Sequence, residues 1–431
     1  MLPDLIEIIP LRESVRAQVT VPGSKSITNR ALILAALARG KVILRGALWS
    51  EDTQVMVDCL GRLGFAIGVS EDPAEECNRT LSITGLGGRI PRGGSGDAPL
   101  DLFVGNAGTA ARFLSALVCL GDGVYRLHGV PRMHERPQGA LFAALRELGF
   151  LVEAEGRPDK LPVRIEGRGS QSHGRTASVQ IGESSQFASA LLLSAHAGEW
   201  KIEVDGHNPE ESPYVAMTLE LIKTFPHAGG EFQIEPDASS GSYIWAAGSL
   251  PEQNAITVSH WPVSNWQFDQ HFPEVMGRLL RGQGAAVVSR DRDLGDSIMT
   301  AITLAPLCGR EVRFEDLGRL RVQECERVMA LRTELTRCGA RAVEKGDTLE
   351  ISPSVLHGAE IQTYDDHRMA MCFAVLGLAI PGIRLQNPGC VKKTFPNFFQ
   401  KLCAAPPLGL NAKVVDPETR KPLTGRALFA D

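Results

Sequence analysis

A turn near the start of the chain gathers three side chains that could bind an anion. The stretch 21–30, with the sequence VPGSKSITNR, leads from a strand-like run into a helix and carries Lys25, Ser26 and Arg30. Free backbone N–H groups at a helix start, together with nearby cations, suit a phosphate or a carboxylate. An ordinary strand, turn and helix with solvated cations would contain the same residues, so this stretch alone leaves both interpretations open.

Four further stretches place polar or charged residues at turns. They are LFVGNAGT at 102–109, GVPRMHERP at 129–137, LRVQECER at 320–327 and YDDHRMAMC at 364–372. The second puts two arginines ahead of a helix that starts with proline, and the third puts Glu324 and Arg327 one helical turn apart. The fourth puts His367 and Arg368 at a helix start, and Lys393 follows later in the chain. Taken singly, each stretch could equally be a helix cap or a surface ion pair.

The common nucleotide and zinc fingerprints are absent. Lys25 follows Ser24 rather than glycine, which excludes a Walker loop, and neither G-x-G-x-x-G before a helix nor H-E-x-x-H occurs. The nine cysteines include no C-x-x-C pair, so we expect reduced thiols and neither a disulfide framework nor a zinc cluster.

The elements that must position these residues form a repeated pair of helices. The first helix of each pair is dense in Ala, Ser, Gly and Leu, which predicts burial on most sides, and the second is amphipathic. The first helices are predicted at 29–38, 109–120, 186–196, 240–250, 297–307 and 367–379. The second helices are predicted at 53–63, 137–148, 214–224, 273–281, 326–338 and 395–403. Glycines 64, 149, 229, 284 and 339 end most of the second helices before short β-rich runs. Each of the six repeats is therefore predicted as β, buried helix, β, surface helix, β, although any α/β protein alternates such elements.

The starts of all six buried helices carry polar or charged residues. Six such helix N-termini would be costly to bury without partners, but they are explained if they converge on a shared anionic ligand. The residues concerned are 25–30, 106–109, 184–186, 237–240, 296–297 and 366–368.

A chain of 431 residues is too long for one compact core and predicts two or three domains. A break at Glu235-Pro236-Asp237 divides the six repeats into three plus three. We expect one globular domain of residues 1–20 plus 237–431 and a second of residues 21–236. The proline-rich tail after Leu402 is expected to be peripheral.

Composition predicts a soluble globular protein, with 43% hydrophobic and 22% charged residues. The sequence shows no apolar run of transmembrane length and no signal or transit peptide, so we expect a cytoplasmic protein without a membrane partner. A net charge of −5 gives no support for nucleic-acid binding.

Taken together and in this order, the motifs closely resemble those of the 5-enolpyruvylshikimate-3-phosphate (EPSP) synthases within the enolpyruvyl transferase family. The resemblance covers residues 21–402, and GSKSxxNR, GNAGTA, SSQF and DDHRMAM are highly specific in combination. It implies an α/β fold of two domains, an inside-out barrel-like architecture in which each domain has three βαβαββ repeats around a pseudo-threefold axis and two strands form the hinge. It also implies an enzyme of amino-acid and chorismate biosynthesis that transfers the enolpyruvyl group of phosphoenolpyruvate to the 5-hydroxyl of shikimate-3-phosphate, with no metal or organic cofactor. We expect the protein to be a monomer.

The resemblance also implies roles for individual residues. Asp296 would accept the 5-hydroxyl proton and Glu324 would protonate the methylene carbon, with Lys25 and His367 assisting. The expected phosphoenolpyruvate site comprises Lys25, Gly108, Arg132, Gln186, Arg327, Arg368 and Lys393. The expected shikimate-3-phosphate site comprises Lys25, Ser26, Arg30, Ser184, Ser185, Gln186, Tyr214, Asp296, Arg319 and Gln323.

Three departures from the family pattern concern the expected substrate sites. Glu211 replaces a common serine, and Gln323 replaces the lysine of Asn-x-Arg-x-Lys-Glu. A carboxylate added and a cation removed should weaken anion binding unless Arg319 turns inward, so we expect an altered affinity for shikimate-3-phosphate. Phe113 stands where glyphosate-sensitive members commonly carry proline, which could shift Gly108 and alter the fit of the inhibitor.

Three alternatives remain. A sister enolpyruvyl transferase acting on UDP-N-acetylglucosamine typically has a reactive loop cysteine, but this chain has no cysteine between Cys119 and Cys308. A catalytically silent relative would fit the changes at 211 and 323, yet Lys25, Asp296, Glu324 and His367 are present. A solenoid scaffold should not place cations at helix starts.

Overall fold

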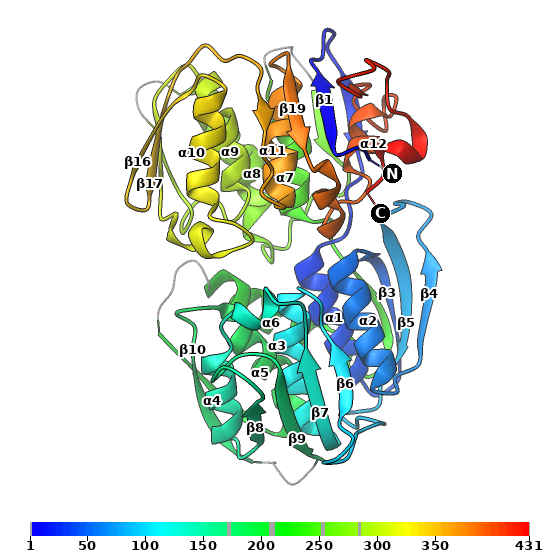
Figure 1. Ribbon diagram of the computed structural model, residues 1–431. Coiled ribbons are helices and arrows are strands. Elements are labelled where there is room, and N and C mark those ends of the chain that lie inside the picture. Colours follow the sequence, from blue (N-terminus) through cyan, green and yellow to red (C-terminus); the bar gives the residue numbers. More distant parts are fainter. Residues whose placement is uncertain (1, 170–173, 207–211, 251–254, 283–285, 431) are drawn as a thin grey trace. The chain divides into compact units, whose positions relative to one another are not determined.

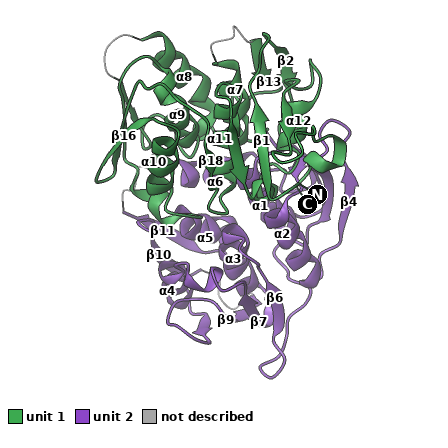
Figure 2. Cartoon of the chain, turned by 45° about the horizontal axis from the view of Figure 1, so that its top comes forward, with its two compact units in different colours: residues 1–22, 236–431 green, residues 23–235 purple. Residues whose placement is uncertain are grey.

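The chain forms two compact units in the computed structural model, which describes residues 2–169, 174–206, 212–250, 255–282 and 286–430. Unit 1 contains residues 1–22 and 236–431, and unit 2 contains residues 23–235 (Figure 2). Unit 2 is thus continuous in sequence, whereas unit 1 is assembled from both ends of the chain.

The helices of unit 2 alternate with short strands. The helices are α1 (Lys25–Leu37), α2 (Glu51–Arg62), α3 (Gly108–Leu117), α4 (Gly139–Glu147), α5 (Ser185–Gly198) and α6 (Ser212–Thr224). The strands are β3 (Lys41–Leu48), β4 (Ile67–Glu71), β5 (Asn78–Thr84), β6 (Leu100–Phe103), β7 (Asp122–His128), β8 (Leu151–Ala154), β9 (Val163–Arg168), β10 (Thr176–Gln180), β11 (Lys201–Asp205) and β12 (Gly230–Gln233). In the described part of unit 2 they form sheets of order β12-β3-β5-β4, β6-β7-β9-β8 and β10-β11. The first two sheets have the same plan, a parallel pair extended by an antiparallel pair.

Unit 1 repeats this plan (Figure 1). Its helices are α7 (Ala238–Gly248), α8 (Phe272–Arg281), α9 (Ile298–Leu304), α10 (Arg327–Arg337), α11 (His367–Gly377) and α12 (Phe398–Cys403). Its strands are β1 (Leu5–Ile9), β2 (Arg16–Val19), β13 (Ala255–Val258), β14 (Ala286–Ser289), β15 (Val312–Glu315), β16 (Arg341–Lys345), β17 (Thr348–Ser352), β18 (Glu360–Ile361), β19 (Ile383–Gln386) and β20 (Lys413–Val415). The sheets described in unit 1 have the orders β14-β15-β17-β16, β18-β19-β1-β20 and β13-β2.

One helix from each repeat is buried at the centre of its unit. Helices α1, α3 and α5 contact one another in unit 2, and α7, α9 and α11 do so in unit 1. All residues of α3 are buried, as are residues 27–36 of α1. The second helices bury one face, as in α8, where Phe272, Val275, Met276 and Leu279 are spaced by one helical turn or less. The predicted alternation of buried and amphipathic helices is therefore confirmed.

Two segments connect the units, one from β2 to α1 and one from β12 to α7. The backbone N–H of Ser24 donates to the carbonyl of Glu235 at 2.8 Å, and the N–H of Asp237 donates to the carbonyl of Pro22 at the same distance. A Cβ at Gly23 would overlap the carbonyl oxygen of Gly46, so only glycine fits where the chain enters unit 2.

The two ends of the described chain meet in one sheet. Strand β1 pairs antiparallel with both β19 and β20, and Leu410 and Val414 in the C-terminal segment are buried. The expectation that the tail after Leu402 is peripheral is wrong, because its strand completes the sheet that covers α11.

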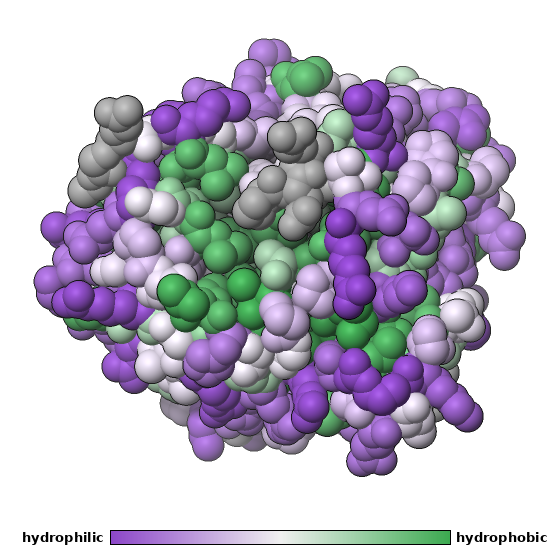
Figure 3. All heavy atoms as spheres, turned by 90° about the horizontal axis from the view of Figure 1, so that it is seen from above, coloured by the Kyte–Doolittle hydropathy of each residue, from purple (hydrophilic) through white to green (hydrophobic). Residues whose placement is uncertain are grey.

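The surface carries both polar and apolar side chains. On the face shown in Figure 3, polar side chains surround a group of apolar ones near the middle. Among the residues that the structure describes, no helix is long and apolar enough to cross a membrane. All nine cysteines are free thiols, and most of them are buried.

Candidate active site

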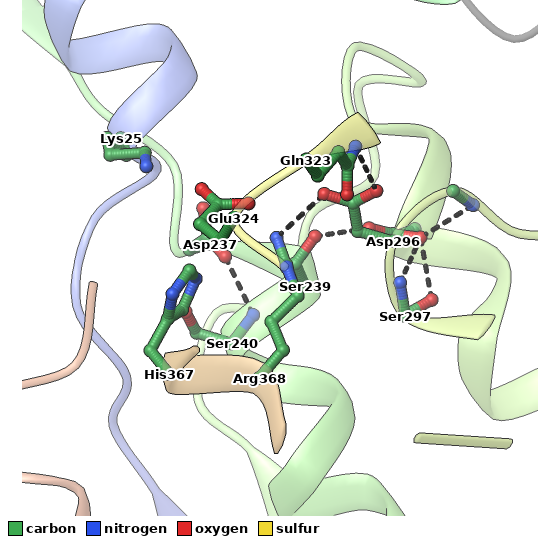
Figure 4. A network of polar contacts seen from close by, with 12 residues as sticks. Lys25, Asp237, Ser239, Ser240, Asp296, Ser297, Gln323, Glu324, His367 and Arg368 are labelled. Atoms are coloured by element: carbon green, nitrogen blue, oxygen red, sulfur yellow. Dashed lines mark hydrogen bonds and ion pairs between the residues drawn. The ribbon is translucent and has the colours of Figure 1, made fainter. Parts of the chain in front are cut away.

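The starts of the three central helices of unit 1 bring polar side chains together (Figure 4). Arg368, at the start of α11, places Nη2 3.2 Å from Oδ2 of Asp296, which lies just before α9. The same guanidinium donates through Nη1 to the hydroxyl of Tyr243 on α7 at 3.4 Å. The convergence of helix starts predicted from the sequence is therefore present within this unit.

A carboxylate that the sequence analysis missed, Asp269, fixes two of these helix starts. Its Oδ1 accepts from the backbone N–H of Gly295 at 2.8 Å and from the hydroxyl of Ser297 at 2.6 Å. Its Oδ2 accepts from the hydroxyl of Ser239 on α7. Burial raises the pKa of Asp269. Because Gly295 and Ser297 flank Asp296, this buried carboxylate determines where the Asp296 backbone lies.

Three arginines surround the carboxylate of Asp296. Arg290 lies 3.0 Å from Oδ1, Arg368 lies 3.2 Å from Oδ2, and Arg327 lies 3.7 Å from Oδ2. Burial alone would raise the pKa of Asp296, but the charges of Arg368, Arg290 and Arg327 outweigh it and hold the pKa well below its usual range. Asp296 is therefore a carboxylate anion throughout the physiological pH range.

A second carboxylate, Glu324, is held between two cations. Its Oε2 lies 2.8 Å from Nη2 of Arg327, and its Oε1 lies 3.0 Å from Nζ of Lys393. Glu324, which the sequence spaces one helical turn from Arg327, contacts it from the bend before α10. Arg327 consequently bridges the two carboxylates that the sequence analysis singled out for proton transfer.

Arg327 is itself held by a buried partner. Its Nε lies 2.7 Å from Oδ2 of Asp366 and its Nη2 lies 3.3 Å from Oδ1, and both side chains are almost completely excluded from solvent. Asp366 also caps α11, because Oδ1 accepts from the backbone N–H of Arg368 at 2.9 Å. The neighbouring His367 is buried, with Nδ1 3.7 Å from Oδ1 of Asp366.

Among the positions that depart from the family pattern, Gln323 contacts Asp296. Gln323 donates through Nε2 to Oδ1 of Asp296 at 3.3 Å and accepts from Arg327, so its amide joins the Asp296 cluster. Arg319 lies in a short 3-10 helix at Gly318–Val322, and its compensating role stays a prediction. Glu211 lies outside the described residues.

In unit 2, Lys25 is placed at the first residue of α1. Its Nζ lies 3.1 Å from Oδ2 of Asp52 near the start of α2, and Asp52 is the more deeply buried partner. The Lys25 side chain is partly exposed, so the ammonium group is fixed by a carboxylate from the neighbouring helix without being enclosed.

Arg30 is buried and binds protein groups from three helices. It donates to the hydroxyls of Thr218 at 2.7 Å and Ser189 at 3.1 Å, and to the carbonyl of Ser26 at 3.0 Å. Its guanidinium carbon also lies 5.3 Å from the ring centre of Phe113, which is fully buried. Arg30 thus connects α1 to α5 and α6, and Phe113 packs against that connection.

Arg136 and Arg112 are the cations beside Gly108. A Cβ at Gly108 would lie 2.6 Å from Nη2 of Arg136 and 2.5 Å from Nη1 of Arg112. Arg132, the residue expected from the sequence, is half exposed and lies 2.7 Å from Oε2 of Glu135. The stretch 132–136 offers two arginines, and its sequence alone does not distinguish the one that turns toward Gly108.

The start of α5 lies beside the start of α3. Gln186 accepts through Oε1 from Nη1 of Arg112 at 3.1 Å, and Ser184 caps α5 through the backbone N–H of Gln186. Ser185 is buried in the first turn of α5. Tyr214 lies on α6, where its carbonyl accepts from Thr218 at 2.8 Å. Apart from Arg132, the expected residues of unit 2 therefore lie near the starts of α1, α3 and α5 and on α6.

Comparison with known proteins identifies relatives along nearly the whole chain. Residues 11–228 and 226–402 match the family model described as EPSP synthase (3-phosphoshikimate 1-carboxyvinyltransferase). Curated proteins named 3-phosphoshikimate 1-carboxyvinyltransferase are similar, including that of Trichormus variabilis, 39% identical over 92% of this chain and 98% of the relative. That of Opitutus terrae is 38% identical over 93% of this chain and 97% of the relative.

Solved structures support the fold. An EPSP synthase structure from Acinetobacter baumannii has a TM-score of 0.74 at 20% identity, covering 96% of this chain and 100% of that one. The enolpyruvyl transferase NikO from Streptomyces tendae has a TM-score of 0.66 at 15% identity, covering 95% and 98%. The predicted α/β fold of two domains with a barrel-like architecture is confirmed.

Proposed function

The chain belongs to the EPSP synthase family, and we propose that it transfers the enolpyruvyl group of phosphoenolpyruvate to the 5-hydroxyl of shikimate-3-phosphate and releases phosphate. This reaction is a step of the shikimate pathway to chorismate and the aromatic amino acids. The observation that carries the proposal at the level of chemistry is the pair of carboxylates, Asp296 and Glu324, on either side of Arg327.

The reaction requires two proton transfers of opposite direction. In the addition step, the 5-hydroxyl oxygen bonds to C2 of phosphoenolpyruvate, its proton passes to Asp296, and Glu324 gives a proton to C3. In the elimination step, the bond from C2 to the phosphate oxygen breaks, the leaving phosphate takes the proton held by Asp296, and C3 returns a proton to Glu324, which restores the C2–C3 double bond in the enol ether product. An ionised Asp296 suits the role of base, and three arginines supply the charge that keeps it ionised.

The cations of unit 1 suit the carboxylate of phosphoenolpyruvate. Arg327, Arg368 and Lys393 are each within 3.7 Å of Asp296 or Glu324. A substrate carboxylate would compete for these cations and leave Glu324 freer to carry a proton. Binding of the phosphoenolpyruvate carboxylate would thereby promote protonation of Glu324. His367 lies beside Arg368 at the start of α11.

In unit 2, we assign the phosphate of phosphoenolpyruvate to Lys25, Gln186 and Arg136, with the backbone of Gly108 beside it. Arg136 replaces Arg132 in this assignment because its guanidinium is next to Gly108, whereas Arg132 is bound to Glu135. Helix starts with adjacent guanidinium groups are well suited to phosphate.

The proposed shikimate-3-phosphate contacts in unit 2 are Lys25, Ser26, Ser184, Ser185, Gln186 and Tyr214. Arg30 would support them from beneath, because its guanidinium holds the carbonyls of Ser26 and Tyr214. In unit 1, Asp296, Gln323 and Arg319 complete the proposed set.

The proposal is tested by phosphate release from phosphoenolpyruvate with and without shikimate-3-phosphate. We expect release that depends on the second substrate, and a loss of kcat of about 10²- to 10⁴-fold in D296N and in E324Q. D347N is the matched control, because Asp347 is an exposed carboxylate of the same unit, 2.9 Å from Arg321. Release that is independent of any shikimate derivative, or full activity in both variants, would contradict the proposal.

The proposal extends to the state in which the protein acts. We expect a cytoplasmic monomer that binds only these small molecules and no nucleic acid, as its net charge of −5 suggests. Light scattering coupled to gel filtration, with and without both substrates, tests the monomer, and a mass of twice 46.5 kDa would exclude it.

A further inference from the structure

Arg290 lies next to Asp296 in a turn that is held by several backbone hydrogen bonds. The hydroxyl of Ser289, the last residue of β14, accepts from the backbone N–H groups of Asp291 at 3.1 Å and Arg292 at 3.2 Å. Asp293 accepts from the N–H of Ser289 at 2.9 Å, and the N–H of Arg290 donates to the carbonyl of Glu315 at 3.1 Å. The backbone at Arg290 is therefore fixed on both sides before its side chain makes any contact.

The guanidinium of Arg290 is buried against one oxygen of Asp296. The side chain is 3% exposed, and Nη2 lies 3.0 Å from Oδ1. Gln323 donates to the same oxygen at 3.3 Å. The other oxygen, Oδ2, faces Arg368 and Arg327 instead. The two oxygens of this carboxylate thus have different environments.

The two oxygens of Asp296 differ in whether their partners are also assigned to phosphoenolpyruvate. Arg327 and Arg368 on the Oδ2 side are the cations assigned to the carboxylate of phosphoenolpyruvate, so an arriving substrate anion competes with Asp296 for them. Arg290 and Gln323 on the Oδ1 side belong to no such assignment for phosphoenolpyruvate. An oxygen whose partners are drawn toward the substrate is the one available to accept a proton.

We propose that Arg290 is a positioning residue for the proton-accepting step, which holds Oδ1 of Asp296 so that Oδ2 faces the 5-hydroxyl of the acceptor. The inference rests on the proposed role of Asp296 as the base. Neither the motifs of the family nor the sequence analysis singled out Arg290, which lies in the polar run SRDRD with a second arginine two residues away.

The charges that act on Asp296 among the described residues are those of Arg290, Arg327 and Arg368, together with the carboxylate of Asp269 before α8. Further carboxylates face these arginines: Glu324 and Asp366 act on Arg327, and Asp237 acts on Arg368. When the substrate engages Arg327 and Arg368, Arg290 remains as the cation in contact with the base. An opposite charge at this range lowers the pKa of a carboxyl group by about 1 to 3 units.

Removing that charge should shift the pH dependence of catalysis in one direction. The base works when it is ionised, so a higher pKa moves the acidic limb of the kcat profile to higher pH. We expect this limb to lie about 1 unit or more higher in R290Q than in the parent protein. R290K keeps the charge, and its limb should stay where the parent has it, although kcat falls because an ammonium lacks the geometry of a guanidinium.

The experiment measures kcat and both KM values for the full chain and its variants from pH 9 down to the lowest pH at which each stays folded, because the pKa of Asp296 lies below its usual range. R292Q is the matched control, because Arg292 lies in the same turn, is 69% exposed and contacts Glu315 at 3.4 Å. D296N is measured in parallel, since a D296N variant with full kcat would overturn the role of Asp296 rather than that of Arg290. Thermal unfolding identifies any variant that fails to fold. If R290Q fails, R290K carries the test through kcat, which should fall with an unmoved limb and unchanged KM values, and an unchanged kcat in R290K would overturn the inference.

The possible outcomes distinguish a positioning role of Arg290 from a substrate-binding or a structural role. A raised limb in R290Q but not in R292Q or R290K, with the KM for shikimate-3-phosphate changed less than about threefold, supports the inference. An unmoved limb with a raised KM for shikimate-3-phosphate overturns it, because Arg290 would then bind substrate. An unmoved limb with unchanged KM values overturns it as well, because the residue would then be structural.

Discussion

The buried pair of Arg327 and Asp366 gives the most quantitative prediction. In the D366N variant the guanidinium of Arg327 loses a charged partner that contacts it through two atoms, at 2.7 and 3.3 Å. Arg327 is 1% exposed and Asp366 is 0% exposed, so water cannot replace the lost carboxylate. The charge of Arg327, now only partly compensated, should therefore destabilise unit 1.

The size of the effect follows from the environment. Breaking a buried ion pair by removing one partner costs about 3–5 kcal/mol. Glu324 and Asp296 also lie within 3.7 Å of Arg327 and offset part of the loss, which places D366N near the lower end, at about 3 kcal/mol. Asparagine still caps α11, whereas D366A also loses the cap and should cost about 1 kcal/mol more.

Hydrogen exchange of the α11 amides measures this loss where it occurs. Because 1.4 kcal/mol corresponds to a factor of ten, D366N should speed exchange roughly a hundredfold and D366A several times more. Peptides from α3 in unit 2 provide the internal reference. D347N removes an exposed partner of Arg321 and should change exchange by less than about fivefold.

Equal small effects of D366N and D347N on exchange would refute this role of Asp366. Arg327 would then be held by Glu324 and Asp296 alone. Equal effects in D366N and D366A would refute only the contribution of the helix cap.

Three further changes test other parts of the site. In G108A the added Cβ would lie within 3 Å of the guanidinium groups of Arg112 and Arg136, which are the far ends of long side chains and can shift, so the fold should persist while the KM for phosphoenolpyruvate rises about tenfold; an unchanged KM would remove this glycine from the site. In D52N the ammonium of Lys25 loses its partner at 3.1 Å, and kcat/KM should fall about tenfold without loss of stability above 1 kcal/mol; equal activity would show that Lys25 needs no such anchor. In Q323K a cation returns to the position where the family commonly has lysine, so the KM for shikimate-3-phosphate should fall roughly two- to fivefold with a steeper salt dependence; a raised KM would contradict the assignment of this residue.

The helices could be predicted because their signals are local. In α8, for example, the apolar residues recur on one face of the helix within ten positions. Gly64, Gly149 and Gly339 follow helices and have φ values between 86° and 96°. The polar helix starts were equally local, so the contact of Arg368 with Asp296 at another helix start in unit 1 followed from the repeat.

The remaining features depend on partners that are distant in sequence. Asp269 lies in a stretch with no periodicity, and only its contacts with Ser297 and Ser239 reveal what it does. Arg290 is one of two arginines in a charged run, and Arg136 is one of two in a turn. In each pair the sequence shows two equal cations, and tertiary packing decides which one is buried or turned toward the site.

The pairing of β1 with β19 and β20 has a consequence for synthesis of the chain. β1 leaves the ribosome about 380 residues before β19 and about 405 residues before β20, which at typical elongation rates is a delay on the order of tens of seconds. Unit 2 has all its strands available once β12 has emerged, so it can complete its fold while Leu5–Ile9, the apolar segment LIEII, still lacks its final neighbours. The first strand to be synthesised is thus among the last to form its backbone hydrogen bonds. Until then its unpaired edges can pair with strands of other chains, which is a route to aggregation.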